Sequence, residues 1–143
     1  EREKMRIQSL HTGFIMPTKG SDRAGAFDIY MPEDGFATGF MRVYGLGFAT
    51  EIPAGHVALI LPRSSTGAKY GLELNNTCGV IDSDYRGEWK AVLRTKDGRK
   101  HHWSAGDRLL QFLVIPVAQV SMELVESVDN TARGIGGFGS SGI

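Results

Sequence analysis

The chain of 143 residues, 41% hydrophobic and 22% charged, has the size of one compact domain with a modest hydrophobic core. Its 16 lysines and arginines balance its 16 aspartates and glutamates, so it lacks the strong positive field that non-specific nucleic-acid binding needs. The single cysteine, Cys78, excludes an intrachain disulfide framework and a CxxC metal site, and is typical of a reducing, cytoplasmic compartment.

The sequence also lacks the signatures of membrane insertion and secretion. No apolar run approaches the roughly 20 residues that cross a bilayer. Residues Glu1–Lys4 are charged, without the apolar stretch of a secretory signal. We therefore expect a soluble cytoplasmic protein with no nucleic-acid or membrane partner.

Short apolar stretches separated by turn signals, together with 19 glycines, predict an all-β domain. In chain order, residues 22–24 and 31–35 are expected to be loops. Residues 55–62 alternate in polarity and predict a strand. Residues 64–70 predict the one short helix, with Ser64 or Ser65 capping its first turn.

The second half of the chain continues as strand, turn and strand. Residues 88–94 alternate again, and Lys96-Asp97-Gly98-Arg99 follows as a hairpin turn of the Asp-Gly type. Residues 109–117 are almost continuously apolar, which predicts a strand buried on both faces. Half of residues 134–143 are glycine, too few side chains to fold alone. We expect a β domain at residues 1–127 and a glycine-rich arm at 128–143.

Five segments within this plan carry the residues of a binding or catalytic site: AGAFDIY (24–30), PRSS (62–65), GVIDSDYRG (79–87), GDRLLQ (106–111) and RGIGGFGSSG (133–142). In this order and spacing they resemble the five motifs of the trimeric dUTPase family, over nearly the whole chain. The resemblance implies hydrolysis of dUTP to dUMP and pyrophosphate by water attack at the α-phosphorus. This reaction limits uracil incorporation into DNA and supplies dUMP for thymidylate synthesis.

The resemblance also implies an architecture and an assembly. It implies a jelly-roll-like β-barrel or sandwich of the β-clip type, with one short helix and a flexible C-terminal arm. It further implies a homotrimer with active sites at the subunit boundaries, each closed by the arm of a neighbouring subunit.

Asp82 is the candidate general base, because a rigidly held carboxylate can orient water and take its proton. The resemblance places Asp82 at the position of the family's base. Asp84 is interpreted as organising nearby arginines, with a purely structural role equally open. In the family, the tyrosine at the position of Tyr85 packs under the deoxyribose and excludes a 2′-hydroxyl. From sequence alone, Tyr85 could equally be an ordinary cross-strand aromatic.

The uracil pocket is assigned to residues in and around the GVID segment: Asn76, Gly79, Val80, Ile81 and, through its backbone, Lys90. Backbone groups can distinguish uracil from cytosine, since uracil N3–H donates and O4 accepts where cytosine shows the reverse. Asn76 lies in what reads as a tight hairpin closed by Gly79. It could instead be only an Asx-turn residue.

The phosphate site is assigned to Arg63, Ser64 and Ser65, which combine a guanidinium, two hydroxyls and the N–H groups of a helix start. Gln111 resembles the family's glutamine at the phosphate chain, although it could also face solvent at a sheet edge. Asp28 is interpreted as supporting the phosphate-site arginine.

Asp107 and Arg108 are predicted to form a structural ion pair. The chain departs from the family pattern at Tyr44, Arg94 and Leu110. These differences are expected to affect packing or the trimer's central channel rather than the reaction.

The arm contributes Arg133, Phe138, Gly139, Ser140 and Ser141. Its glycines let backbone N–H groups approach phosphate, and Phe138 has nothing of its own to pack on. The resemblance implies that Phe138 covers the uracil while Arg133 and the serines hold the terminal phosphates. The arm is therefore predicted to act as a lid.

No metal ligand set is evident, because His11, His56, His101 and His102 lack ligand spacing with each other or with Cys78. Mg²⁺ is expected as the cofactor, carried by the triphosphate itself.

Two other functions remain open. A dCTP deaminase of the same fold would need a glutamate beside the pyrimidine, and Glu73 and Glu88 are the only glutamates that flank the pocket motifs. The other is a non-catalytic nucleotide-sensing or protein-binding module, which would need neither Asp82 nor a complete arm.

Overall fold

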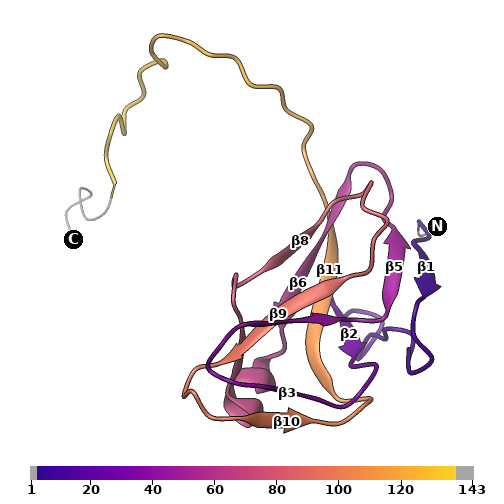
Figure 1. Ribbon diagram of the computed structural model, residues 1–143. Coiled ribbons are helices and arrows are strands. Elements are labelled where there is room, and N and C mark those ends of the chain that lie inside the picture. The colour runs from indigo at the N-terminus through magenta and orange to yellow at the C-terminus, as the bar shows by residue number, and fades with distance from the viewer. Residues whose placement is uncertain (1–2, 138–143) are drawn as a thin grey trace.

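The structure is a computed structural model that describes residues 3–137. Short antiparallel strands wrap around one core (Figure 1), which confirms the predicted all-β, jelly-roll-like fold. In chain order the elements are β1 (Arg6–Ser9), β2 (Phe27–Tyr30), β3 (Gly35–Ala37), β4 (Arg42–Gly45), β5 (Phe48–Glu51), β6 (His56–Pro62), the helical turn η1 (Thr66–Tyr70), β7 (Leu72–Leu74), β8 (Gly79–Ile81), β9 (Lys90–Thr95), β10 (His101–Trp103) and β11 (Arg108–Pro116).

The strands form two larger sheets and two short ribbons. The four-stranded sheet has the order β2-β11-β6-β8, and the three-stranded sheet has the order β4-β9-β7. The ribbons are β1-β5 and β10-β3. The pairing of β6 with β11 runs without a break from Leu110↔Pro62 to Pro116↔His56, so these two strands form the centre of the larger sheet.

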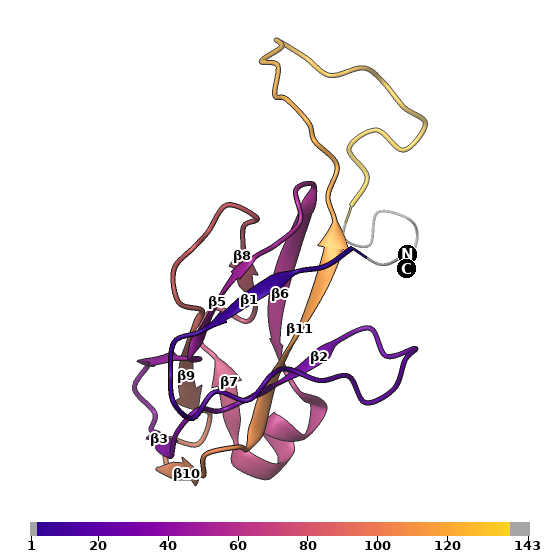
Figure 2. The same ribbon diagram turned by 90° about the vertical axis from the view of Figure 1, so that its right-hand side faces the viewer.

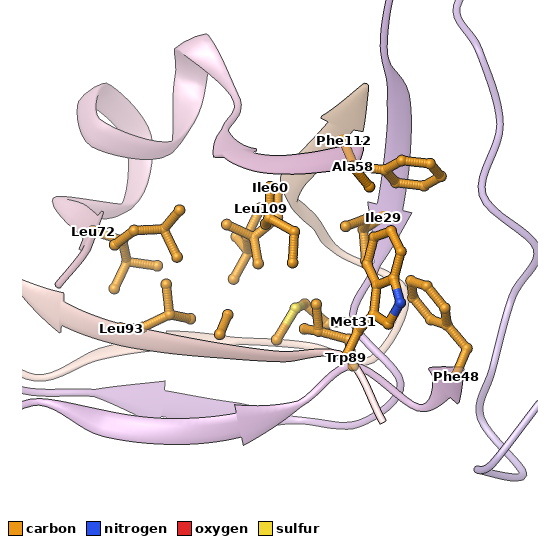
Figure 3. Packing of buried hydrophobic residues seen from close by; sticks show 14 of the residues in the cluster. Ile29, Met31, Phe48, Ala58, Ile60, Leu72, Trp89, Leu93, Leu109 and Phe112 are labelled. Atoms are coloured by element: carbon orange, nitrogen blue, oxygen red, sulfur yellow. The ribbon is translucent and has the colours of Figure 1, made fainter. Parts of the chain in front are cut away.

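Buried side chains from both larger sheets meet in a single core (Figure 3). Leu72 and Leu93 enter it from the three-stranded sheet, and Ile60 and Leu109 from the four-stranded sheet. This packing removes apolar surface from water, the main favourable term in folding.

Trp89 is fully buried at one end of this core. Its ring lies between those of Phe48 and Phe112, with centroid distances of 4.8 and 5.0 Å. Its indole Nε1 donates to Oγ1 of buried Thr50 at 3.0 Å, so both polar groups are paired inside the core.

The predicted strand at residues 55–62 is confirmed as β6, with Ala58 and Ile60 buried. The predicted helix is confirmed as a short helical stretch that ends at Tyr70. Its end is set by Gly71, which adopts a left-handed φ of 63° and donates its N–H to Gly67 O. The capping prediction is wrong for Ser65, because the residue at the cap position makes no side-chain hydrogen bond to the helix.

The two predicted hairpins are wrong. The turn at residues 96–99 joins β9 to β10, but β9 pairs with β4 and β7 while β10 pairs with β3. The segment before Gly79 joins β7 to β8, which pair with β9 and β6 respectively. Both turns carry the chain from one sheet to another, since a local turn signal does not specify which strand is the partner.

Strand β11 is buried on both faces only in its first half. Leu109, Leu110 and Phe112 are buried, whereas Ile115 and Pro116 are exposed. Val117 N–H donates to Gly55 O at 2.8 Å, and the chain then leaves the body as a long extended segment (Figures 1 and 2). Within residues 3–137, no helix has the length and apolar character that a membrane span requires.

Candidate active site

Three of the sequence motifs meet in a cavity of about 490 Å³ beside β2, β6 and β11. Asp28, Arg63, Ser64 and Gln111 line it, together with glycines and alanines from residues 20–26. The small residues leave backbone accessible, while the guanidinium and the hydroxyl supply donors. This combination suits an anion such as phosphate.

Asp28, which lines this cavity, lies between two guanidiniums. Its Oδ1 is 3.0 Å from Nε of Arg63 and its Oδ2 is 3.2 Å from Nη1 of Arg108. Arg63 Nη1 also donates to Arg108 O at 3.0 Å. Because one carboxylate faces two cations, the cluster keeps a net positive charge and its arginines are held in fixed orientations.

The predicted ion pair between Asp107 and Arg108 is wrong. Arg108 turns to Asp28, whereas Asp107 Oδ2 accepts the N–H of Ser104 at 2.9 Å. Sequence reasoning therefore missed Arg108 as the second partner of Asp28. The available signal was its place three residues before Gln111 in the GDRLLQ motif.

Gln111 lies at the centre of the sheet, since β11 has β2 on one side and β6 on the other. The alternative of a glutamine at a solvent-facing edge is therefore wrong. Its Nε2 donates to Pro62 O at 3.0 Å, which ties it to the PRSS segment. Ser64 is exposed and lines the cavity, whereas Ser65 is half-buried and does not line it.

A second, smaller cavity of about 180 Å³ lies where β8 ends and β9 begins. Its lining residues are Val80, Ile81, Asp82, Tyr85, Glu88 and Lys90. Asp82 is exposed at the end of β8, and Tyr85 is 41% exposed beside it. A carboxylate next to an aromatic ring in a small hollow has the chemistry to bind a nucleoside and to orient a water.

Asn76 does not line this cavity. Its Nδ2 donates to Cys78 O at 3.0 Å, so its side chain bonds to the backbone of its own turn. Thr77 beside it adopts a positive φ of 68°, an uncommon backbone conformation for a residue with a branched Cβ. Gly79 packs directly on Ile60, where an added Cβ would lie 3.2 Å from the isoleucine Cβ.

Asp84 is exposed and makes no ion pair within residues 3–137. Its predicted partnership with arginines is therefore not made within these residues. Arg133 lies on the extended segment, where its Nε donates to Gly136 O at 2.7 Å. Phe138, Gly139, Ser140 and Ser141 lie outside the described residues.

The two cavities share no lining residue, and the register of β6 shows that they are far apart. Ile81 pairs with Ala58 near one end of β6, and Leu110 pairs with Pro62 at the other end. Ala58 and Pro62 are four residue steps apart along the strand, about 13 Å. Strands β6 and β8 are antiparallel. Asp82, which follows Ile81, and Arg63, which follows Pro62, therefore lie toward opposite ends of β6, and one chain does not bring them together.

Histidines take no part in either cavity. His11 faces Glu33, His56 faces Glu3 and His101 faces Asp97, at 3.2 to 3.4 Å. In the part of the chain that the structure covers, no three His, Cys, Asp or Glu side chains gather as a metal site would require.

Comparison with known proteins matches this sequence and this fold to one group. The family model described as dUTPase matches residues 12–142. A deoxyuridine 5′-triphosphate nucleotidohydrolase of Nautilia profundicola is 36% identical over 97% of this chain and 99% of its own length. That of Paramecium bursaria Chlorella virus 1 is 38% identical over 96% of both chains. That of Nocardia farcinica is 41% identical over 95% of this chain and 84% of its own.

Solved structures show the same fold. The dUTPase of Staphylococcus bacteriophage 80alpha with dUpNHpp superposes with a TM-score of 0.88 at 22% identity, over 99% of this chain and 100% of that chain. A mutant dUTPase of phage phi11 of S. aureus, described with a structural Mg(II) ion, has a TM-score of 0.79 at 20% identity, over 87% and 98%. The site thus lies in an all-β nucleotide-hydrolase fold. The chain belongs to the dUTPase family.

Proposed function

We propose that this protein is a dUTP diphosphatase that hydrolyses dUTP to dUMP and pyrophosphate, with water attacking the α-phosphorus. One observation carries the proposal. A chain of the dUTPase family presents a cationic cavity around Arg63 and a separate cavity that holds Asp82 and Tyr85. The first suits a triphosphate and the second suits a deoxynucleoside.

Asp82 is the proposed general base. It follows directly from β8, which is hydrogen-bonded to the central strand β6, so its backbone is anchored while its side chain reaches solvent. A carboxylate in this position can orient a water and accept its proton as the water attacks.

The Asp28–Arg63–Arg108 cluster and Gln111 are proposed to hold the phosphate chain, with Ser64 and Ser65 adding hydroxyls. Ion pairing to Asp28 fixes Arg63 before substrate arrives. Donors that are already oriented stabilise developing negative charge without having to reorganise.

Tyr85 is proposed to exclude the 2′-hydroxyl of ribonucleotides, and the backbone from Gly79 to Ile81, with Lys90, to read the uracil. Asn76 is proposed to shape the preceding turn through its bond to Cys78 rather than to reach the base directly.

Because the two cavities are separate on one chain, we propose that each complete site is formed with a second copy of the chain. The exposed segment after β11 supports this assembly. Val120, Met122 and Leu124 alternate along it and are 76%, 93% and 99% exposed. This is the pattern of a strand with one apolar face and no partner. We propose a homotrimer in which residues 118–127 complete a neighbour's β domain.

Residues 128–143 then form the arm that closes over a shared site. Arg133 and the serines at 140 and 141, with Gly139, would hold phosphate, and Phe138 would cover the uracil. Closure of such a lid excludes bulk water from the reaction.

Mg²⁺ is proposed to arrive on the triphosphate. The one carboxylate at the phosphate cavity, Asp28, is engaged by two guanidiniums, and the other donors there suit phosphate oxygens rather than a cation. These residues therefore do not form a direct Mg²⁺ ligand set. Mg²⁺ usually keeps several waters and binds through substrate phosphates.

The deciding experiment measures pyrophosphate release from dUTP, dCTP, dTTP and UTP in parallel with Mg²⁺ and identifies each nucleotide product. We expect release from dUTP alone, with dUMP as product. Product from dCTP would indicate a deaminase, and no release from any of the four would indicate a binding module. Within residues 3–137, both glutamates considered for the deaminase are already engaged, since Glu73 pairs with Arg94 and the Glu88 carboxylate accepts Gly47 N–H.

A further inference from the structure

Residues Asp82–Glu88 form a loop that is closed by its own hydrogen bonds. Tyr85 N–H donates to Asp82 O at 3.1 Å. Arg86 Nη1 donates to Ser83 O at 2.6 Å, and the Tyr85 hydroxyl donates to Glu88 O at 2.8 Å. The phenol is thus bonded to the backbone three residues ahead of it.

Gly87 makes this closure possible. A Cβ at residue 87 would lie 2.5 Å from the Tyr85 hydroxyl oxygen and 2.7 Å from Cζ, well inside van der Waals contact. The ring therefore lies directly against the Gly87 backbone. Because Tyr85 is 41% exposed, packing alone does not fix its ring, and the bond to Glu88 O supplies the restraint.

Glu88 is itself fixed by contacts on the other side of the loop. Its Oε2 accepts Gly47 N–H at 3.0 Å, and a Cβ at Gly45 would lie 2.4 Å from the same oxygen. The next residue, Trp89, is fully buried and exchanges backbone hydrogen bonds with Leu46 and Phe48. The Glu88 carbonyl is therefore presented to Tyr85 from a rigid position.

We infer that Glu88 is a positioning residue that fixes the ring of Tyr85 and so sets the discrimination between dUTP and UTP. The inference rests on the proposed function. Rejection of one extra hydroxyl is steric, and it works only where the excluding group cannot move aside. A tyrosine that loses its anchor makes room for the ribose.

The test compares kcat/KM for dUTP with kcat/KM for UTP in the full-length protein. Glu88→Ala removes the bond to Gly47, and Tyr85→Phe removes only the bond to Glu88 O. Each is expected to lower the dUTP/UTP ratio about three- to tenfold, the factor that corresponds to losing the neutral hydrogen bond between the Tyr85 hydroxyl and Glu88 O. Glu88→Gln keeps an acceptor for Gly47 N–H and is expected to keep the wild-type ratio.

Glu73→Ala is the matched control. It also removes a half-buried glutamate, but one that pairs with Arg94 on the β7-β9 sheet and lies outside both cavities. It is expected to leave the ratio unchanged. A thermal melt of each variant separates a loss of selectivity from a loss of stability.

A wild-type ratio in Glu88→Ala would overturn the inference, even if its melting temperature falls. Should Glu88→Ala not fold, a wild-type ratio in Tyr85→Phe overturns it in the same way. If the wild-type protein releases pyrophosphate from neither nucleotide, the proposed function fails and the inference fails with it. If wild type prefers dUTP and the variants do not lose that preference, only the inference fails.

Discussion

At the scale of single residues, the two cavities differ in how their aspartates are paired. Asp28 is only 16% exposed on its side chain, and its two arginine partners prevent an unpaired charge at the phosphate cavity. Asp82 is exposed and unpaired within the described chain, so its carboxylate remains available to water. Asp28 therefore holds two cations in place, whereas the Asp82 carboxylate is open to solvent, as its proposed role as general base requires.

Asp82→Asn is expected to reduce kcat for dUTP at least about 100-fold, the lower range for removal of a general base. An amide has similar size and still contacts water but does not take its proton, so nucleotide affinity should persist. Steady-state kinetics and titration with a non-hydrolysable dUTP analogue measure the two effects. Equal losses of affinity and turnover would contradict the assignment, and Asp84→Asn should lose less turnover.

At the scale of elements, several turns are held by side chains rather than by strand pairing. The 96–99 turn joins two strands that lie in different sheets, so no ladder closes it. The side chain of Asp97 stabilises the turn instead, since its Oδ1 accepts Arg99 N–H at 2.9 Å and its Oδ2 lies 3.2 Å from His101 Nε2. The hydrogen bond from Arg99, followed by that from His101, lowers the pKa of Asp97.

The lowered pKa of Asp97 determines whether its contribution to folding stability rises or falls with pH. A carboxylate with a lower pKa in the folded state stabilises the fold above its unfolded pKa and loses this contribution as pH falls through the folded value. Asp97→Asn should therefore destabilise the protein at about pH 7 and matter less near pH 3, below the ordinary aspartate value of about 3.9. Urea midpoints at both pH values test this, and a gap that is equal at both would contradict it.

At the scale of the whole molecule, residues 118–137 extend away from the β domain of their own chain (Figure 1). Val120, Met122 and Leu124 expose apolar side chains that a second copy would cover. The same assembly would join the Arg63 cavity of one copy to the Asp82 cavity of another. Stability and catalysis are thus expected to depend on one oligomer.

Deleting residues 133–143 should leave the oligomer intact and reduce dUTP hydrolysis severely, because only the lid is lost. Deleting residues 118–143 should also dissociate the oligomer, because the exchanged strand is lost with it. Light scattering after size-exclusion chromatography measures the assembly, and pyrophosphate release measures the activity. Unchanged turnover in the shorter deletion would refute the lid, and an intact oligomer in the longer one would refute strand exchange.

Local patterns were sufficient for much of the fold. Alternation along residues 55–62 and the apolar run at 109–117 predicted β6 and β11, because side-chain period depends only on backbone geometry. The family motifs also singled out Asp28, Arg63, Ser64 and Gln111, which line one cavity in the structure, while their roles toward a substrate remain predictions. The two hairpins were wrong because strand partners are chosen by long-range packing, which no turn motif encodes.

The sequence by itself determined the all-β class, the five motifs and the family, because residue type and spacing carry them. Only the tertiary structure decided that Asp28 bridges Arg63 and Arg108, that Glu88 anchors Tyr85, and that the two cavities lie at opposite ends of β6. These facts depend on register between strands that are distant in sequence. Register is set by which side chains the shared core can bury, a property of the whole chain and of no single segment.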